Sequence, residues 1–187
     1  MNILVLIKPV PDPEHEKEIQ IDERSGRLIR DGVPQIIDPQ SRNALEEALQ
    51  LAGCAEGRAQ VMVLTMAPPT AKEKLIETLA MGADEAFLLS DKAFGGADTY
   101  ATSYTLSQAV RKIEKEKEMQ FDLILAGSSS SDGGTSHVPV QVAEWLGRAH
   151  LSNVCSLELA PGGTKGRVFR AVKRSEEVML AFEGEAP

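Results

Sequence analysis

Short continuous apolar runs recur along the chain, separated by stretches in which apolar residues return every three or four positions. Each run is rich in Val, Leu or Ile, which is typical of strands buried on both faces of a sheet. The stretches between them have the spacing of amphipathic helices. The predicted strands lie at residues 3–7, 59–65, 85–89 and 121–126, and the predicted helices at 44–52, 75–80, 99–117 and 138–146.

Strands that alternate with helices at this spacing predict βαβ units, and so an α/β fold with helices on both faces of a parallel sheet. Residues 151–158 would add a fifth strand. We therefore expect a doubly wound, mostly parallel five-stranded sheet, with strand order 3-2-1-4-5. The pattern then changes: the turn PGGTKG, flanked by VFRAVKR and EVMLAFE, predicts an antiparallel ribbon.

The whole chain, residues 1–187, is expected to form a single α/β domain with two additions. The C-terminal ribbon covers about residues 151–187. An N-terminal insertion covers about residues 14–34, where EIQIDERSGRLI predicts a small hairpin around its Ser-Gly pair. The insertion makes the connection from the first predicted strand to the first predicted helix unusually long. Such long connections usually serve an interface or a ligand.

The segment SSSSDGGTSH, residues 128–137, follows the fourth predicted strand. In the expected order that strand lies beside the first, where the connections diverge and open sheets bind ligands. Gly133 and Gly134 would let backbone N–H groups converge on an anion, and a helix would begin near Ser136. Asp132 is unfavourable beside a phosphate and would instead hold the loop or meet a sugar hydroxyl. The alternative is a Ser/Gly connection that merely solvates or caps a helix.

Other polar positions near the same edge have structural explanations of their own. Asp38 before Pro39 and Asp98 before Thr99 are both suited to capping a helix. His137 is as compatible with a first helical turn as with a ligand contact. The loop after the second strand, which begins at Met66, should face the same crevice.

Composition narrows the range of functions. A net charge of −8 disfavours binding to nucleic acid or to an anionic membrane. Cys54 and Cys155 fit no zinc or disulfide pattern, and no segment suits a signal peptide or a bilayer span, so we expect a cytoplasmic protein without membrane insertion. No metal site is indicated. GxSxG, Walker and HExxH motifs are absent, and no catalytic residue is nominated.

The chain resembles the β subunit of an electron-transfer flavoprotein over nearly its whole length. MNILVLIKPVPD is similar to the family's opening strand and loop, and DGVPQIIDPQSRNALEEALQL to the start of its first helix. VLTMAPPTAKEKLIETLAMGADEAFLLSD resembles its second and third βα units. AGSSSSDGGTSHVPVQVAEWLG resembles its nucleotide-phosphate loop.

The resemblance implies that residues 1–187 form a nucleotide-binding domain, with a sheet of the adenine-nucleotide-binding type. It also implies a heterodimer with an α subunit, whose FAD shuttles electrons between dehydrogenases and acceptors. The β subunit of this family binds AMP or, in electron-bifurcating members, a second FAD. LSDKAFGGADTYATSYTL resembles the bifurcating type, which favours FAD over AMP here. The chain would be an electron carrier rather than a classical enzyme, with NADH-dependent flavin chemistry arising only in complex with the α subunit.

Carried over position by position, the resemblance places nucleotide contacts at the first strand, the first helix, the second strand and the phosphate loop, with two more positions for FAD. These residues are Leu6, Asp38, Met66, Asp98, Thr99, Ser128, Ser129, Ser130, Ser131, Asp132, Gly133, Gly134, Thr135, Ser136 and His137.

Three departures from the family pattern matter. Members commonly have a basic residue and a glutamine where Ser128 and Ser129 stand, so a positive charge is missing from the loop. They commonly have an amide where Asp38 stands. The pattern also continues beyond the position of Pro187 into another strand, a partner-recognition loop and a C-terminal arm, so the chain is either a piece or a short variant. The alternative function is a stand-alone adenine-nucleotide-binding sensor or regulatory module. A nucleotide-cleaving enzyme is disfavoured. The segment SSSSDGGTS is faintly similar to the SGG loop of pyrophosphatase-type enzymes, but that loop follows the first strand, whereas this segment follows the fourth.

Overall fold

Four parallel strands form the centre of the molecule, in the order β7-β6-β1-β8. The computed structural model describes residues 1–18, 20–24, 28–29, 32–55, 59–159, 165–172 and 176–183. The predicted α/β class and the order of the first four strands are confirmed. The strands are β1 (Asn2–Leu6), β6 (Gln60–Met66), β7 (Glu85–Leu89) and β8 (Leu123–Ala126).

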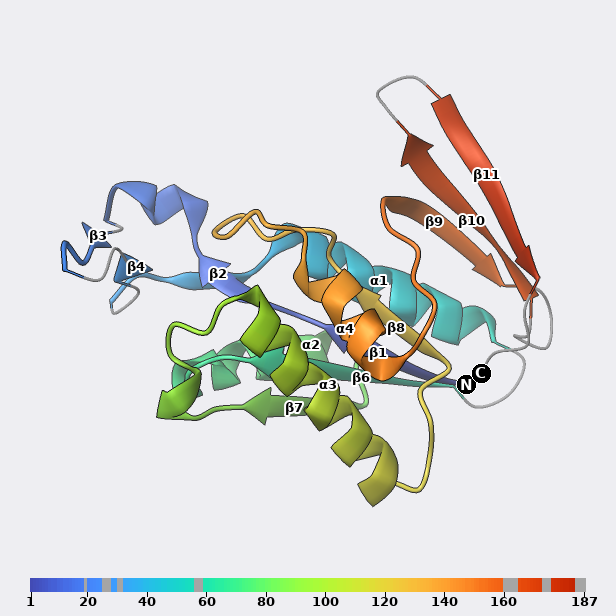
Figure 1. The fold of residues 1–187 in the computed structure, drawn as a ribbon, viewed down its shortest axis with the longest axis horizontal. Coiled ribbons are helices and arrows are strands. Elements are labelled where there is room, and N and C mark those ends of the chain that lie inside the picture. The colour runs from blue at the N-terminus through green and yellow to red at the C-terminus, as the bar shows by residue number, and fades with distance from the viewer. Residues whose placement is uncertain are drawn as a thin grey trace.

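Helices cover both faces of this sheet (Figure 1). Successive strand side chains point to opposite faces, so β1 contributes to two cores. Ile3 packs in a cluster with Leu45 and Leu75 of α1 and α2, whereas Leu4 packs with residues of α3 and α4. The helices are α1 (Pro39–Cys54), α2 (Lys72–Met81), α3 (Thr99–Glu116) and α4 (Val138–Leu146), with 3₁₀ turns at Pro69–Ala71 and Lys92–Phe94.

The predicted fifth strand is not confirmed as part of the parallel sheet. Its counterpart, β9 (Val154–Leu159), pairs antiparallel with β10 (Lys165–Val172), which pairs in turn with β11 (Glu176–Glu183). The physical reason is its side-chain pattern: Leu157 alone is buried among residues 154–158, whereas a central parallel strand is buried on both faces. The Leu157 N–H donates to a Glu47 carboxylate oxygen on α1, at 3.1 Å. Residues 161–164 of the predicted turn lie outside the described residues.

Two short antiparallel strands pair at the base of the insertion between β1 and α1. β2 (Pro9–Pro11) pairs with β5 (Gln35–Ile37). Farther out, a 3₁₀ segment is followed by two short strands that pair with each other, and these lie at the left of Figure 1. Their predicted Ser-Gly turn lies outside the described residues. The outer elements are η1 (Pro13–Glu18), β3 (Gln20–Ile21) and β4 (Leu28–Ile29).

The start of β1 is tied to the segment before β8. The Asn2 backbone N–H donates to an Asp122 carboxylate oxygen at 2.6 Å, and the Asn2 side-chain amide donates to the Gln120 carbonyl at 3.0 Å. Farther along, β1 residues Ile3 to Leu6 pair with β8. The two strands that flank the expected ligand edge are therefore aligned from one end to the other.

Candidate functional site

The loop of residues 128–137 lies where the connections of the sheet diverge. Leu6 at the end of β1 pairs with Ala126 at the end of β8. The chain leaves β1 for α1 on one face and leaves β8 for α4 on the other. Figure 1 shows the loop, in orange, beside the start of α1. Parallel sheets bind ligands at this kind of divergence.

The first residues of α1 hold the beginning of the loop. One carboxylate oxygen of Asp38 accepts the Gln40 N–H at 3.0 Å and so caps the helix, while the other accepts the Ser131 N–H at 2.8 Å. Asp38 is 1% exposed. The Gln40 side-chain oxygen accepts the Ser128 hydroxyl at 2.6 Å and the Ser129 N–H at 2.9 Å. Asp38 therefore has two structural duties, the cap that the sequence indicates and a contact with the loop.

Two glycines give the loop its path. At Gly127 a Cβ atom would lie 2.9 Å from the Gln40 Cβ and 3.0 Å from the Ser41 N, so the chain could not pass α1 this closely with a side chain. Gly134 has φ +61°, in the left-handed region that glycine adopts at little cost. Ser136 also has a positive φ, of 57°, just before α4.

A lysine from β1's end provides the positive charge that Ser128 and Ser129 lack. The Lys8 ammonium donates to the Ser130 hydroxyl at 2.9 Å and to an Asp132 carboxylate oxygen at 2.5 Å. The Asp132 side chain is only 4% exposed and the Lys8 side chain 42% exposed. Asp132 thus holds the loop, which is one of the two roles considered for it.

The remaining predicted residues are more scattered. Leu6 is 8% exposed and packs in the core, and Met66 is half-buried against the same cluster. Asp98 caps α3 by accepting the Ala101 N–H at 2.8 Å, and Thr99 is the first residue of that helix. The His137 side chain makes no capping hydrogen bond at α4. The structure joins residues 128–132 to α1 and β1, and no described hydrogen bond links Asp98 or Thr99 to them.

Sequence reasoning missed Lys8 and Gln40, which make four of the side-chain contacts that fix the loop. A pattern was available for Lys8. It is a charged residue directly after a buried strand next to the point of divergence, where a ligand-facing side chain is expected. For Gln40 no such pattern exists, since the second residue of a helix is ordinarily solvent-exposed and polar.

A surface hollow of about 260 Å³ lies elsewhere, at the last turns of α3 and α4. Its charged groups already have partners, one another or backbone carbonyls. Arg148 donates to the Phe121 carbonyl at 2.8 Å and to Glu114 at 2.7 Å, and Arg111 donates to the Trp145 carbonyl at 2.6 Å. These bonds tie two helices to the start of β8. The hollow is therefore explained by structure, and the loop is the stronger candidate.

The donor set of the loop suits an anionic group. Lys8 brings a cation, and the exposed Thr135 brings a hydroxyl. The N-terminus of α4 follows, where free N–H groups and the helix dipole favour negative charge. The buried Asp132 carboxylate opposes this, but it is already paired with Lys8. The residues present therefore fit a nucleotide phosphate.

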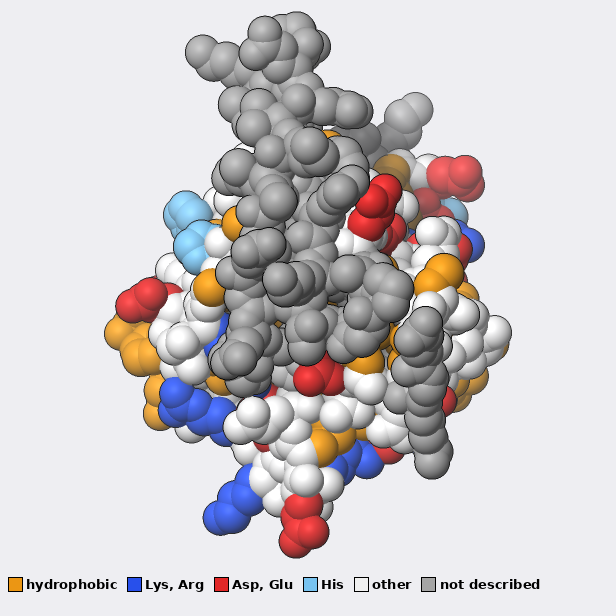
Figure 2. Space-filling model, turned by 90° about the vertical axis from the view of Figure 1, so that its right-hand side faces the viewer, with side chains coloured by type: hydrophobic (Ala, Val, Ile, Leu, Met, Phe, Trp, Pro, Cys, Tyr) orange, Lys and Arg blue, Asp and Glu red, His pale blue; other side chains and the backbone are white. Residues whose placement is uncertain are grey.

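The rest of the surface adds two observations. Seen from the end where β1 begins, acidic and basic side chains are interspersed over the part that is not drawn in grey (Figure 2). Among the described residues, no helix combines the length and apolar character needed to cross a membrane.

The fold is that of a doubly wound α/β protein, and the candidate loop lies at the carboxyl ends of its strands, where sheets of this kind bind ligands. Residues 25–180 match the model of the electron transfer flavoprotein domain, and the chain belongs to that family. The resemblance to the family's β subunit is confirmed by relatives that bear its name.

Three relatives illustrate the similarity. The electron transfer flavoprotein subunit beta of Clostridium acetobutylicum is 47% identical over 85% of this chain and 57% of its own length. Subunit CarD of the caffeyl-CoA reductase-Etf complex of Acetobacterium woodii is 51% identical over 78% of this chain and 52% of its own. Protein FixA of Azotobacter vinelandii is 43% identical over the whole chain and 63% of its own. This chain thus spans less than two thirds of the length of these relatives, and their names lend no support to a stand-alone sensor.

Proposed function

We propose that this chain serves as the nucleotide-binding part of an electron-transfer flavoprotein β subunit. It binds an adenine nucleotide at the loop of residues 128–137 and, with an α subunit, carries electrons between dehydrogenases and acceptors. The observation that supports this most is the anchoring of that loop by Asp38, Gln40 and Lys8 at the divergence of the sheet. A mere linker would not need three anchors from two other elements.

Each part of the loop has a role in this proposal. The Gly134 N–H closes a turn by donating to the Ser130 carbonyl at 2.9 Å. The Gly133 N–H is the backbone donor proposed for a phosphate oxygen, and Thr135 adds a hydroxyl. Asp38 and Gln40 fix the loop before a ligand arrives, which lowers the ordering cost of binding. Bound flavin would supply the redox chemistry, while the protein positions it and adjusts its surroundings.

FAD is the favoured occupant and AMP the alternative. Support for FAD comes from the resemblance of residues 89–106 to the bifurcating type. Asp98 and Thr99 lie in that segment, at the exposed start of α3. They would add contacts that AMP does not need. The expected partners are an α subunit and a dehydrogenase, in the cytoplasm.

Co-purification tests the proposal. The chain is expressed together with an α subunit encoded beside it, and the absorption spectrum of the purified complex is recorded. A stoichiometric complex with about two flavins per heterodimer supports FAD in this chain, and one flavin with bound AMP supports the alternative occupant.

A colourless protein that retains an adenine nucleotide and forms no complex would contradict the redox role. The loop itself is tested by Gly133→Val with Gly134→Val. Because the second position has a positive φ, the double variant should lose the nucleotide of this chain while keeping the flavin of the partner. Full retention in a folded double variant would count against the loop as the binding site.

A further inference from the structure

We propose that Lys8 and Asp132 form an opposed charge pair that sets how strongly the loop prefers a phosphate-bearing ligand to an uncharged one. Lys8 donates to an anionic group of the ligand, and Asp132 weakens that interaction by sharing the ammonium. The inference rests on the proposed function, because it concerns the same loop. It adds a ligand contact and a determinant of specificity that the family resemblance did not supply.

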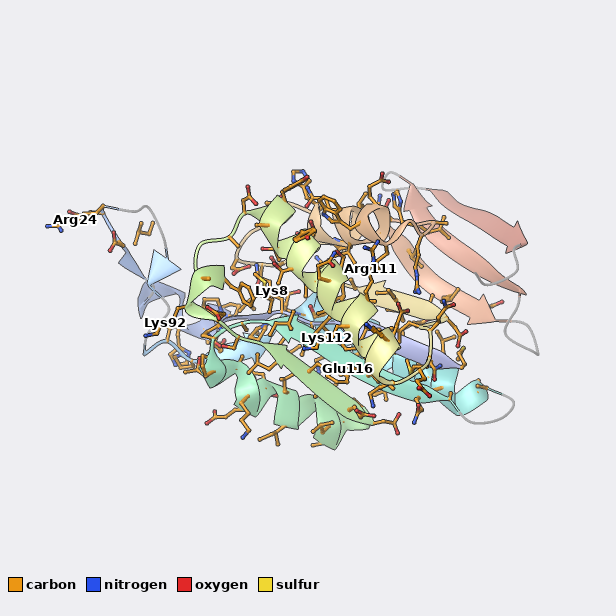
Figure 3. All side chains as sticks on the ribbon, turned by 60° about the horizontal axis from the view of Figure 1, so that its bottom comes forward. Lys8, Arg24, Lys92, Arg111, Lys112 and Glu116 are labelled. Carbon is orange, nitrogen blue, oxygen red and sulfur yellow. The ribbon has the colours of Figure 1, made fainter. Side chains whose placement is uncertain are left out.

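Lys8 has the capacity for this contact. An ammonium group has three N–H donors, and the described contacts use two of them, one to Ser130 and one to Asp132. The side chain is 42% exposed, so solvent reaches it. Figure 3 shows Lys8 amid the side chains beside the sheet. One donor of Lys8 is therefore left for a ligand.

The loop backbone brings a ligand to this donor. A Cβ atom on Gly133 would lie 3.4 Å from the Lys8 nitrogen and 3.4 Å from the Ser130 hydroxyl oxygen. The peptide groups around Gly133 thus run directly past the ammonium. The Gly134 N–H is already used, because it donates to the Ser130 carbonyl at 2.9 Å. An anion that accepts the Gly133 N–H lies within reach of Lys8 as well.

Asp132 acts in the opposite direction. Its carboxylate is nearly buried and contacts the same ammonium at 2.5 Å. A second anion at Lys8 is repelled by this carboxylate, whereas a neutral ligand is not. The pair therefore changes affinity according to the charge of the ligand, while the contacts of Asp38 and Gln40 shape the loop for either ligand.

The test compares AMP with adenosine, which differ by the phosphate. Their affinities are measured by calorimetry at low salt for the wild-type chain in complex with its α subunit and for two variants. Lys8→Gln should weaken AMP binding about tenfold, and Asp132→Asn should strengthen it by roughly threefold to tenfold. Adenosine affinity should change much less than AMP affinity in both variants, because Asp38 and Gln40 still hold the loop.

Matched controls remove one charge at a distance from the loop. Lys112 and Glu116 form an exposed pair on the last turns of α3. Lys112→Gln and Glu116→Gln should leave the ratio of AMP to adenosine affinity at the wild-type value. Lys8→Arg keeps the positive charge and should retain most of the AMP affinity. It keeps the test decisive if Asp132→Asn does not fold.

Equal changes in AMP and adenosine affinity would overturn the inference, since they would mark Lys8 and Asp132 as purely structural. Weaker AMP binding by a folded Asp132→Asn variant would overturn it too. A wild-type complex that binds neither AMP nor FAD at this chain would overturn the proposed function together with the inference. The first two outcomes leave the proposed function intact.

Discussion

Two cation–carboxylate pairs in this molecule have similar chemistry and opposite surroundings. Arg148 and Glu114 are 20% and 15% exposed, and both also bond to the backbone of Phe121. Lys8 and Asp132 are 42% and 4% exposed, and they join the end of one strand to a loop. Backbone groups of Phe121 satisfy both members of the Arg148–Glu114 pair. In the Lys8–Asp132 pair the ammonium stays half-exposed.

The difference shows what separates a structural ion pair from one available to a ligand. Glu114 accepts from both Arg148 and the Phe121 N–H, so breaking the pair leaves buried groups without partners. The described contacts of the Lys8 ammonium go only to Ser130 and Asp132 of the loop. Its long side chain can keep the charge in contact with water. The surface hollow beside Arg148 and Glu114 is therefore a weaker indication of function than the half-exposed ammonium of Lys8, even though Lys8 lies in no deep pocket.

The largest effect on stability should come from Arg148→Met. The variant loses the bonds to Phe121 and Glu114 and leaves a mostly buried carboxylate without its cation. We expect the free energy of unfolding to fall by about 3 kcal/mol, measured by urea denaturation. AMP affinity of the folded variant should stay at the wild-type value. The control is Lys112→Met in the exposed pair on α3, which should cost less than about 0.5 kcal/mol.

A smaller loss of stability is expected from Gly127→Ala, and this substitution should also disturb the loop of residues 128–137. The new methyl group would lie within 3.0 Å of backbone atoms of α1, so the loop or the helix must shift. We expect a loss of about 2 kcal/mol and weaker binding of AMP and adenosine alike. Gly53→Ala in α1 is the matched control, since nothing lies within 4 Å of its new Cβ. An unchanged melting temperature for Gly127→Ala would contradict the close approach.

The smallest effects separate the two helix caps. Asp38→Ala removes a buried cap that also holds Ser131. It should lower the free energy of unfolding by about 2 kcal/mol, slightly less than Gly127→Ala does. Asp98→Ala removes an exposed cap with one described bond and should cost about 1 kcal/mol. Nucleotide affinity should fall with the first. If FAD is the occupant, FAD affinity should fall with the second while AMP affinity does not, which calorimetry with the two ligands distinguishes.

The parallel core could be predicted because each of its elements has a strong local pattern. The helix of residues 138–146 ends where Gly147 adopts a left-handed conformation, as its sequence indicates. The strand of residues 85–89 agrees with the structure at both ends. The strand of residues 151–158 was misplaced because its neighbours were inferred from chain order, whereas its alternating pattern suits an antiparallel edge.

The site was predictable in position but not in its contacts. The order of strands located the loop, since the divergence of connections depends on topology alone. The partners of the loop come from β1 and α1, which are about 90 to 120 residues away in sequence. Single-residue patterns carry no information on such pairings, so the contacts of Lys8 and Gln40 with the loop emerged only from the fold, although the position of Lys8 directly after a buried strand could have marked it as a candidate.

The bonds from Asn2 to Gln120 and Asp122 have a consequence for synthesis on the ribosome. The central strand β1 leaves the exit tunnel before β8, one of its two neighbours, which follows about 120 residues later. At roughly 5–20 residues per second, this interval is about 6 to 24 s. During that time β1 exposes one unpaired edge, which is a site for pairing with a wrong strand. A nascent chain stalled before β8 should therefore recruit chaperones, and release should follow once residues 120–126 emerge.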